Sequence, residues 1–294
     1  DALQADRAML FRKDALRSLV FISLAAGVIF FYLKEKLEAK YAILSLGVLI
    51  LVDMWPIDKR YLNEDHFISQ KKYEKPFTAS KADQYILQDP NLCYRVVDLT
   101  TDPFNDASTS YFHKAIGGYH GAKMRRYQEL IEHYISYEIQ SIGAAMQSQD
   151  INQINTAFSQ SEVLNMLNTK YFIYNPEAQP LINSEANGSA WFVNDYKIVE
   201  NADEEIAALG TLNTKVTTTV DKRFEEFVAG KEFTADSTAR IMLTEYQPNK
   251  LVYETSSASE QLSVFSEIYY PEGWIVSIDG EDAEHFRVNY VLRA

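Results

Sequence analysis

The chain has 294 residues, of which 47% are hydrophobic and 23% charged, a composition typical of globular proteins with room for two domains. Residues 1–60 hold nine Lys and Arg against seven Asp and Glu, while the remainder holds 19 against 34, a net charge of about −15. This negative charge repels phosphate backbones, so nucleic acid is not an expected partner. A single cysteine, Cys93, excludes an internal disulfide scaffold.

Two apolar runs predict a transmembrane helical hairpin over residues 1–56, with the lipid bilayer as partner. Residues 16–33 carry one charge, at Arg17, and residues 41–55 carry one, at Asp53, so both approach the length of a bilayer span. The link between them, KEKLEAK, is too polar to remain in lipid. The alternative is a buried hairpin of a soluble protein, but adjacent helices that are apolar all round fit a bilayer better. The basic residues in the link and before the first run barely decide which side of the membrane the link faces.

The next stretch, residues 57–235, predicts a mixed α/β domain. Ser80 and Asn201 are expected N-caps of short helices. Further helices are expected where apolar residues recur at helical spacing, and strands where short apolar runs lie between turn residues. The expected helices are 81–88, 122–142, 151–158, 162–167 and 203–209, and the expected strands are 93–99, 170–174, 191–199 and 216–220.

From residue 236 to residue 294 the pattern changes to short runs with regular turns. The runs ARIMLTEY, KLVYETS, QLSVFSEIYY, WIVSIDG and HFRVNYVLRA are separated by Gly, Pro and Asn. This spacing predicts an antiparallel β-sandwich, with Asp279-Gly280 as a hairpin turn. The expected fold class is therefore α+β: a transmembrane hairpin, a mixed α/β domain and a C-terminal β-sandwich that continues past the last residue.

A glycine-rich segment with histidines and basic residues is the first candidate binding site. Its glycines permit a positive φ or a close approach of the backbone to a ligand. Free amides at the start of the next helix, together with the basic side chains, suit a phosphate or sugar hydroxyls. The alternative is a structural turn whose histidines bond locally. The candidate residues, named here the glycine-loop cluster, are Tyr111, His113, Gly117, Gly118, Tyr119, His120, Lys123 and Arg126.

The second candidate, named here the aromatic-hairpin cluster, comprises Tyr270, Trp274 and Asp279. Its rings and carboxylate would suit a stacked sugar ring. The alternative is a β-hairpin with aromatic core residues. No metal or cofactor is expected, because His113 and His120 lack zinc spacing and the glycines form no Walker A loop. No GxSxG or HExxH motif assigns a catalytic residue, and acidic pairs are too frequent here to carry weight.

Both clusters lie in segments that resemble the YfhO family of bacterial membrane proteins, identified as GT-C-like glycosyltransferases. The resemblance covers most of the chain. DMWPIDKRYLN, residues 53–63, resembles the segment where a family membrane helix leads into the extracytoplasmic domain. TSYFHKAIGGYHGAKMRRYQELI and NMLNTKYFI match further family segments, the first in a form typical of Bacteroidetes members. EIYYPEGWIVSIDGE with RVNYVLRA resembles the family's closing signature.

The resemblance implies that the chain is the C-terminal part of a glycosyltransferase in the bacterial inner membrane, with its soluble region extracytoplasmic. Its expected role is substrate binding or structural support, with a polyprenyl-linked sugar or an envelope glycan as partner. The family's catalytic carboxylate usually lies in an earlier loop, so the catalytic residues stay unassigned and whether this chain is itself an enzyme stays open. The alternative is a non-catalytic, membrane-anchored carbohydrate- or protein-binding module.

Overall fold

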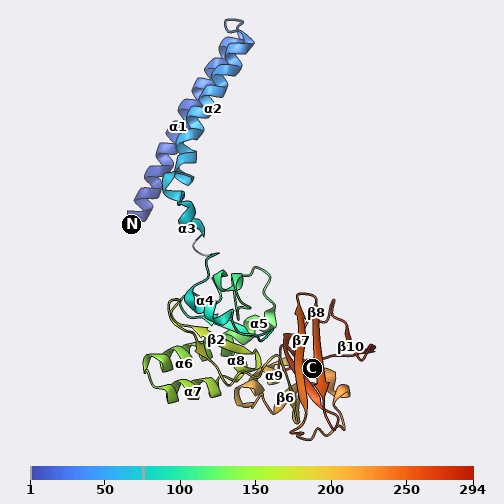
Figure 1. Cartoon of the computed structure of the whole chain (residues 1–294). Helices are drawn as coiled ribbons and strands as arrows, with labels where there is room; N and C mark the ends of the chain where they lie inside the picture. Colours follow the sequence, from blue (N-terminus) through green and yellow to red (C-terminus); the bar gives the residue numbers. More distant parts are fainter. Residues whose placement is uncertain (1, 75–76) are drawn as a thin grey trace. The chain divides into compact units, whose positions relative to one another are not determined.

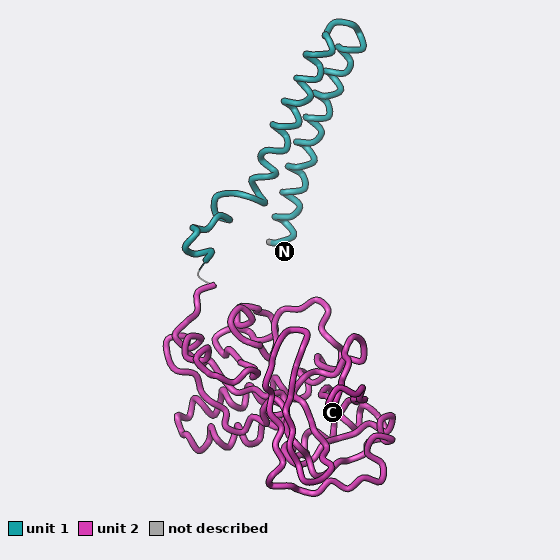
Figure 2. Tube along the Cα trace, turned by 45° about the vertical axis from the view of Figure 1, so that its right-hand side comes forward, with its two compact units in different colours: residues 1–75 teal, residues 76–294 magenta. Residues whose placement is uncertain are grey.

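The computed structural model describes residues 2–74 and 77–294, and the chain divides into two compact units, residues 1–75 and 76–294 (Figure 2). In the first unit, helices α1 (Ala2–Leu33) and α2 (Ala39–Tyr61) lie side by side and run in opposite directions (Figure 1). Both are long and apolar enough to cross a membrane. No described side chain of α1 is buried, and only Ala42 is buried in α2.

Two ion pairs join α1 to α2. Arg60 donates to both carboxylate oxygens of Asp14 at 3.1 and 3.2 Å, and Nε of Arg17 lies 3.3 Å from Asp53. The two charges that interrupt the apolar runs are therefore paired with each other across the hairpin. A charge that borders a bilayer is less costly when it is paired in this way.

The hairpin extends past its expected end at residue 56, and its helices are longer than the two apolar runs. Helix α1 begins at Ala2 rather than near residue 16, and α2 continues through Pro56 to Tyr61. A proline in a helix removes one backbone hydrogen bond, and the helix can continue beyond it when other contacts support it. The 3₁₀-helix η1 (Glu64–His66) and the short helix α3 (Gln70–Glu74) follow.

In the second unit, short helices precede and flank a small sheet. The helices are α4 (Lys81–Ile86), η3 (Ser108–Tyr111), α5 (Arg125–Leu130), the π-helical turn η4 (Ile131–Ile135), α6 (Ser136–Gln147), α7 (Ile151–Gln160) and α8 (Glu162–Met166). The strands are β1 (Arg95–Asp98), β2 (Thr169–Ile173) and β3 (Leu181–Ile182). β1 pairs in parallel with β2, which pairs antiparallel with β3.

The remaining elements form a larger, mixed sheet and two hairpins. The helices are α9 (Ala202–Ala208), η5 (Leu209–Thr211) and η6 (Lys222–Phe227). The strands are β4 (Ala190–Val193), β5 (Asp195–Val199), β6 (Thr217–Asp221), β7 (Arg240–Gln247), β8 (Lys250–Ser256), β9 (Leu262–Ile268), β10 (Val276–Ile278), β11 (Glu281–Ala283), β12 (Arg287–Val288) and β13 (Leu292–Arg293).

The six-stranded sheet has the order β4-β9-β13-β12-β6-β5, and only its β5–β6 pair is parallel. Its two edge strands, β4 and β5, are consecutive in the chain and only Asn194 separates them. Because one residue spans at most about 3.6 Å, the two edges must approach each other, so the sheet curls round. Val193, Val220, Val264 and Leu292 from four of its strands are buried in one core.

One expected strand changes with this topology. Residues 191–199 are expected as one strand. In the structure they belong to two strands, β4 and β5, which are joined by Asn194 and lie at opposite edges of the sheet. β9 pairs with β4, β12 pairs with β6, and β13 lies between β9 and β12, so one sheet contains strands from both sides of residues 235 and 236. The unit is α+β, as expected, with β7–β8 and β10–β11 as separate two-stranded sheets. The sandwich stays a prediction.

Candidate functional site

The two glycines of the glycine-loop cluster close a loop onto its own start. Gly118 has φ +127°, a conformation that side-chain-bearing residues rarely adopt, and its N–H donates to the carbonyl of Pro103 at 2.7 Å. At Gly117, a Cβ would overlap that carbonyl oxygen and lie 2.7 Å from the ring of Phe104. Both glycines therefore serve the packing of the loop, and their backbone approaches protein rather than open space.

His113 is bound inside the unit. Its side chain is 1% exposed, and its Nε2 lies 2.9 Å from Oδ1 of Asp83. The other oxygen of Asp83 accepts from the backbone N–H and the hydroxyl of Ser80, which caps α4. Burial lowers the pKa of His113, and the Asp83 carboxylate opposes that shift. His113 thus joins the loop to the start of α4, which matches the local bonding weighed as the alternative.

The other members of the glycine-loop cluster face outward to different degrees. Tyr119 is 76% exposed and Tyr111 packs edge-on against Phe77, with 4.7 Å between ring centroids. His120 is exposed, and its Nδ1 accepts from the N–H of Ala122 at 3.0 Å. Lys123, half-buried, lies 5.6 Å above the ring of Phe104. Tyr119 and His120 are consequently the members best placed to contact a ligand in solution.

Arg126 belongs to a buried charge network that holds α5, α9 and the β12–β13 turn together. It lies 3.2 Å from the carboxylate of Glu205, which is fully buried and also binds Arg287 at 3.3 Å. Asp221 in turn lies 3.1 Å from Arg287 and 2.6 Å from Arg223. Hydrogen bonds from Arg223 lower the pKa of Asp221 to about 2, whereas burial raises the pKa of Glu205.

Of the two aromatic rings in the aromatic-hairpin cluster, one is exposed to solvent and the other is half-buried. Asp279 (φ 53°) and Gly280 (φ 89°) form the turn between β10 and β11, as expected from the sequence. Asp279 is exposed and Tyr270 is 50% exposed. Trp274 is half-buried, with the guanidinium of Arg293 4.2 Å from its ring centroid. A stacked sugar could therefore reach Tyr270 more readily than Trp274.

The two clusters lie in neighbouring segments of the unit. Lys114 lies next to His113 of the glycine-loop cluster, and Glu267 lies three residues before Tyr270 of the aromatic-hairpin cluster. Nζ of Lys114 is 3.0 Å from the carboxylate of Glu267. The same ammonium lies 4.0 Å from the ring centroid of Tyr246, and the thiol of Cys93 is 3.6 Å from Glu267. Burial is the main reason that the pKa of Cys93 is raised. This partly buried group links the region of β1 to β7 and β9.

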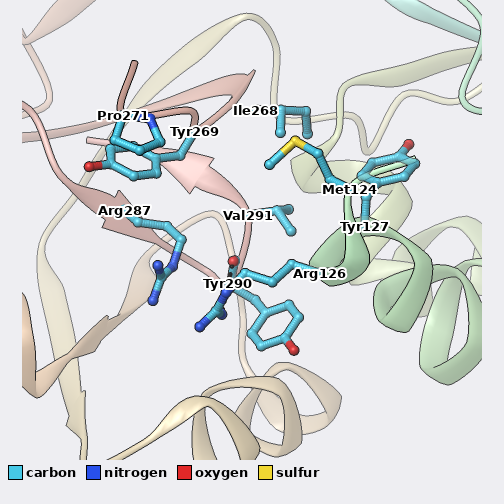
Figure 3. A pocket seen from close by; sticks show the side chains of 9 residues that line it. All are labelled: Met124, Arg126, Tyr127, Ile268, Tyr269, Pro271, Arg287, Tyr290 and Val291. Atoms are coloured by element: carbon cyan, nitrogen blue, oxygen red, sulfur yellow. Dashed lines mark hydrogen bonds between the residues drawn. The ribbon is translucent and has the colours of Figure 1, made fainter. Parts of the chain in front are cut away.

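A cavity of about 170 Å³ lies where these segments meet (Figure 3). The start of α5, the end of β9 and the β12–β13 segment each supply part of its wall. Arg126 and Arg287 extend from different sides, and Arg126 passes below Val291 toward the ring of Tyr290 (Figure 3). The lining residues are Met124, Arg126, Tyr127, Ile268, Tyr269, Pro271, Arg287, Tyr290 and Val291.

Of the eleven residues expected at a site, only Arg126 lines this cavity. The pattern-based reasoning missed Arg287, Tyr269 and Tyr290. A signal was present: Arg287 lies between the apolar residues Phe286 and Val288, and a charge in a buried strand requires a partner. The partners, Glu205 and Asp221, lie far away in sequence, so this segment by itself could not reveal them.

Among the residues that the structure describes, no three His, Cys, Asp or Glu side chains are grouped so as to hold a metal ion. Comparisons with protein-family models, with curated proteins and with solved structures found no match to this chain.

Proposed function

We propose that this protein is part of a glycosyltransferase of the bacterial inner membrane that acts on lipid-linked sugars or cell-envelope polymers. Residues 57–294 lie outside the cytoplasm in this proposal, where they bind substrate or support the membrane part. The observation that carries the proposal is the hairpin of α1 and α2, whose apolar side chains are almost entirely exposed and require a nonaqueous environment. The transferase activity is supported only by the sequence resemblance described above.

The topology can be tested by proteolysis of intact spheroplasts that carry the protein. Digestion of residues 76–294 from outside, with a cytoplasmic marker left intact, is the expected result. Protection of this region until the cells are lysed would place it in the cytoplasm and overturn the proposal, because lipid-linked sugars are used on the outer side in GT-C-like enzymes.

A second candidate function is non-catalytic carbohydrate binding by the folded unit. It is favoured by Tyr119 and Tyr270, two exposed aromatic rings of the kind that stack on sugars. A glycan array probed with the detergent-solubilised protein should then show binding without a lipid donor. Tyr119→Ala should weaken that binding, whereas Tyr137→Ala, which removes an equally exposed ring on α6, should not. An array without bound glycans would eliminate this candidate.

A further inference from the structure

Residues 139–161, which form most of α6 and α7, are almost free of charge. They contain one charged residue, Asp150, although 23% of the whole chain is charged. The carboxylate of Asp150 accepts from the backbone N–H of Asn152 at 2.9 Å and caps α7. The polar face of a helix on a protein surface ordinarily carries charged side chains. The outward surface of these two helices instead presents amides and hydroxyls, which cost less to remove from water than charges do.

The same two helices form the walls of an open groove of about 400 Å³, named here the α6–α7 groove. α6 and α7 lie side by side (Figure 1), and both contribute residues to the lining. The volume lies within the range of about 300–1,000 Å³ that is usual for small-molecule sites. None of the described residues that line the groove is charged. The groove therefore suits a ligand that is itself uncharged.

Five polar side chains of the lining can bind hydroxyl groups. All five residues are exposed, so each can exchange water for a ligand. Amides and hydroxyls both donate and accept hydrogen bonds, as the hydroxyl groups of a sugar do. The hydroxyl of Thr156 donates to the backbone carbonyl of Asn152 at 2.8 Å, which leaves its oxygen able to accept from a ligand. The five residues are Ser141, Asn152, Gln153, Thr156 and Gln160.

Alanine side chains supply the remaining lining of the groove. Ala157 is buried, Ala145 is half-buried and Ala144 is exposed. Their methyl groups suit the C–H face of a sugar ring, while the amides and hydroxyls suit its edge. An anionic polymer fits less well, because no cation in the described lining would offset repulsion by a chain of net charge −13.

We propose that the α6–α7 groove binds an uncharged segment of a saccharide chain. The inference rests on the proposed action of this protein on lipid-linked sugars or envelope polymers, and it adds the place of binding and the charge of the sugar. The groove shares no residue with the glycine-loop cluster or the aromatic-hairpin cluster. Proteolysis of spheroplasts tests the membrane topology without involving the groove, so the two proposals can fail separately.

Five neutral tetrasaccharides serve as probes, built of glucose, galactose, mannose, xylose or N-acetylglucosamine. Tetragalacturonate is the anionic counterpart of the galactose probe. Binding to the whole chain is measured by saturation-transfer NMR titration at neutral pH, in a detergent without a sugar headgroup. At least one neutral probe should saturate with a Kd on the order of 1 mM, a value reasonable for an open site with few anchoring groups. Tetragalacturonate should bind at least about tenfold more weakly than that probe.

Ala144→Trp tests the location. Ala144 is exposed on α6, so a Trp ring at this position can fill the groove without entering the core. The matched control is Asn155→Trp, at an exposed position of α7 that does not line the groove. Binding of the neutral probe should weaken at least about tenfold in Ala144→Trp and stay unchanged in Asn155→Trp. Thermal unfolding midpoints verify that both variants fold.

Gln160→Ala tests the hydrogen bonds without adding bulk. Loss of this exposed amide should weaken binding of the neutral probe about threefold or more and leave the thermal midpoint unchanged. Tyr119→Ala should leave this binding unchanged, which separates the groove from the exposed ring of the glycine-loop cluster.

Three results would overturn the proposal. Absence of saturable binding by all five neutral probes would eliminate the saccharide site. Equal affinity for tetragalacturonate would contradict the preference for an uncharged sugar. Unchanged affinity in a folded Ala144→Trp variant, or in Gln160→Ala, would place the binding elsewhere on the protein.

Discussion

At the residue scale, the glycine loop shows how a backbone requirement can resemble a ligand site. Three glycines in five residues suggested space for a phosphate or a sugar. In the structure, both glycines lie against the carbonyl group of Pro103. A Cβ at Gly117 would overlap its oxygen, and the N–H of Gly118 donates a hydrogen bond to it. Gly121, in contrast, has nothing within 4 Å of the position of a Cβ. The three glycines therefore should respond differently to the same substitution.

Gly117→Ala should lower the free energy of unfolding by about 1–3 kcal/mol, because the added methyl group overlaps backbone that cannot move freely. Gly121→Ala is the control and should have no destabilising effect, since its surroundings are open. Chemical denaturation of the purified protein in detergent measures both. Equal effects in the two variants would show that the loop adapts to the added methyl group.

The stability contributed by Asp221 should depend on pH in a defined direction. Its pKa is lowered to about 2 from an ordinary value of 3.8, so the folded state holds the ionised form. Its contribution, on the order of 2 kcal/mol, is therefore complete above pH 3.8 and is lost as pH falls toward 2. Asp221→Asn should remove this part of the pH dependence of unfolding. Glu226→Gln, at an exposed position in the next segment, should retain it.

At the scale of elements, local signals fixed several helices correctly. Ser80 caps α4 through a reciprocal bond with Asp83, and Asn201 accepts from the N–H of Glu204 at the start of α9. The helical run expected at 122–142 occurs, although it begins at Arg125 and contains a π-helical turn. Caps depend on residues three positions apart, so they can be predicted from sequence. The π-helical turn depends on packing, so it could not be predicted from such local signals.

Helix α7 packs against the rest of the unit through one face. Phe158 is 2% exposed and packs on Phe172 of β2, with ring centroids 5.2 Å apart, while Ile151 on the same helix is 60% exposed. Phe158→Ala should therefore destabilise the unit by about 3–5 kcal/mol. Ile151→Ala should change stability by no more than about 0.5 kcal/mol. A similar loss in both variants, measured by denaturant unfolding, would contradict this assignment of the buried face.

At the scale of the whole molecule, the chain consists of two units with opposite solvent preferences. The apolar side chains of α1 and α2 are exposed, whereas residues 77–294 contain one large and one small cluster of buried apolar residues. The strands β9, β12 and β13 complete a sheet begun by β4 and β6. Truncation after residue 235 would thus remove half of that sheet, while removal of residues 1–75 would leave it complete.

Residues 76–294 produced alone should be folded and soluble without detergent, because this unit keeps its entire core. Residues 76–235 should not fold, since β4 and β6 would lose their partners β9 and β12. Circular dichroism and gel filtration of the two fragments check this. A folded shorter fragment would support the domain boundary expected at residue 236.

The sequence by itself determined the features that depend on neighbouring residues. These are the apolar hairpin, the caps at Ser80 and Asn201, the turn at Asp279, and the position of most strands. Only the tertiary structure decided which strands pair, because partners such as β4 and β9 are about 70 residues apart and pairing depends on packing of the whole sheet. The same reason explains the cavity: Arg126, Glu205 and Arg287 meet only when three distant segments fold together.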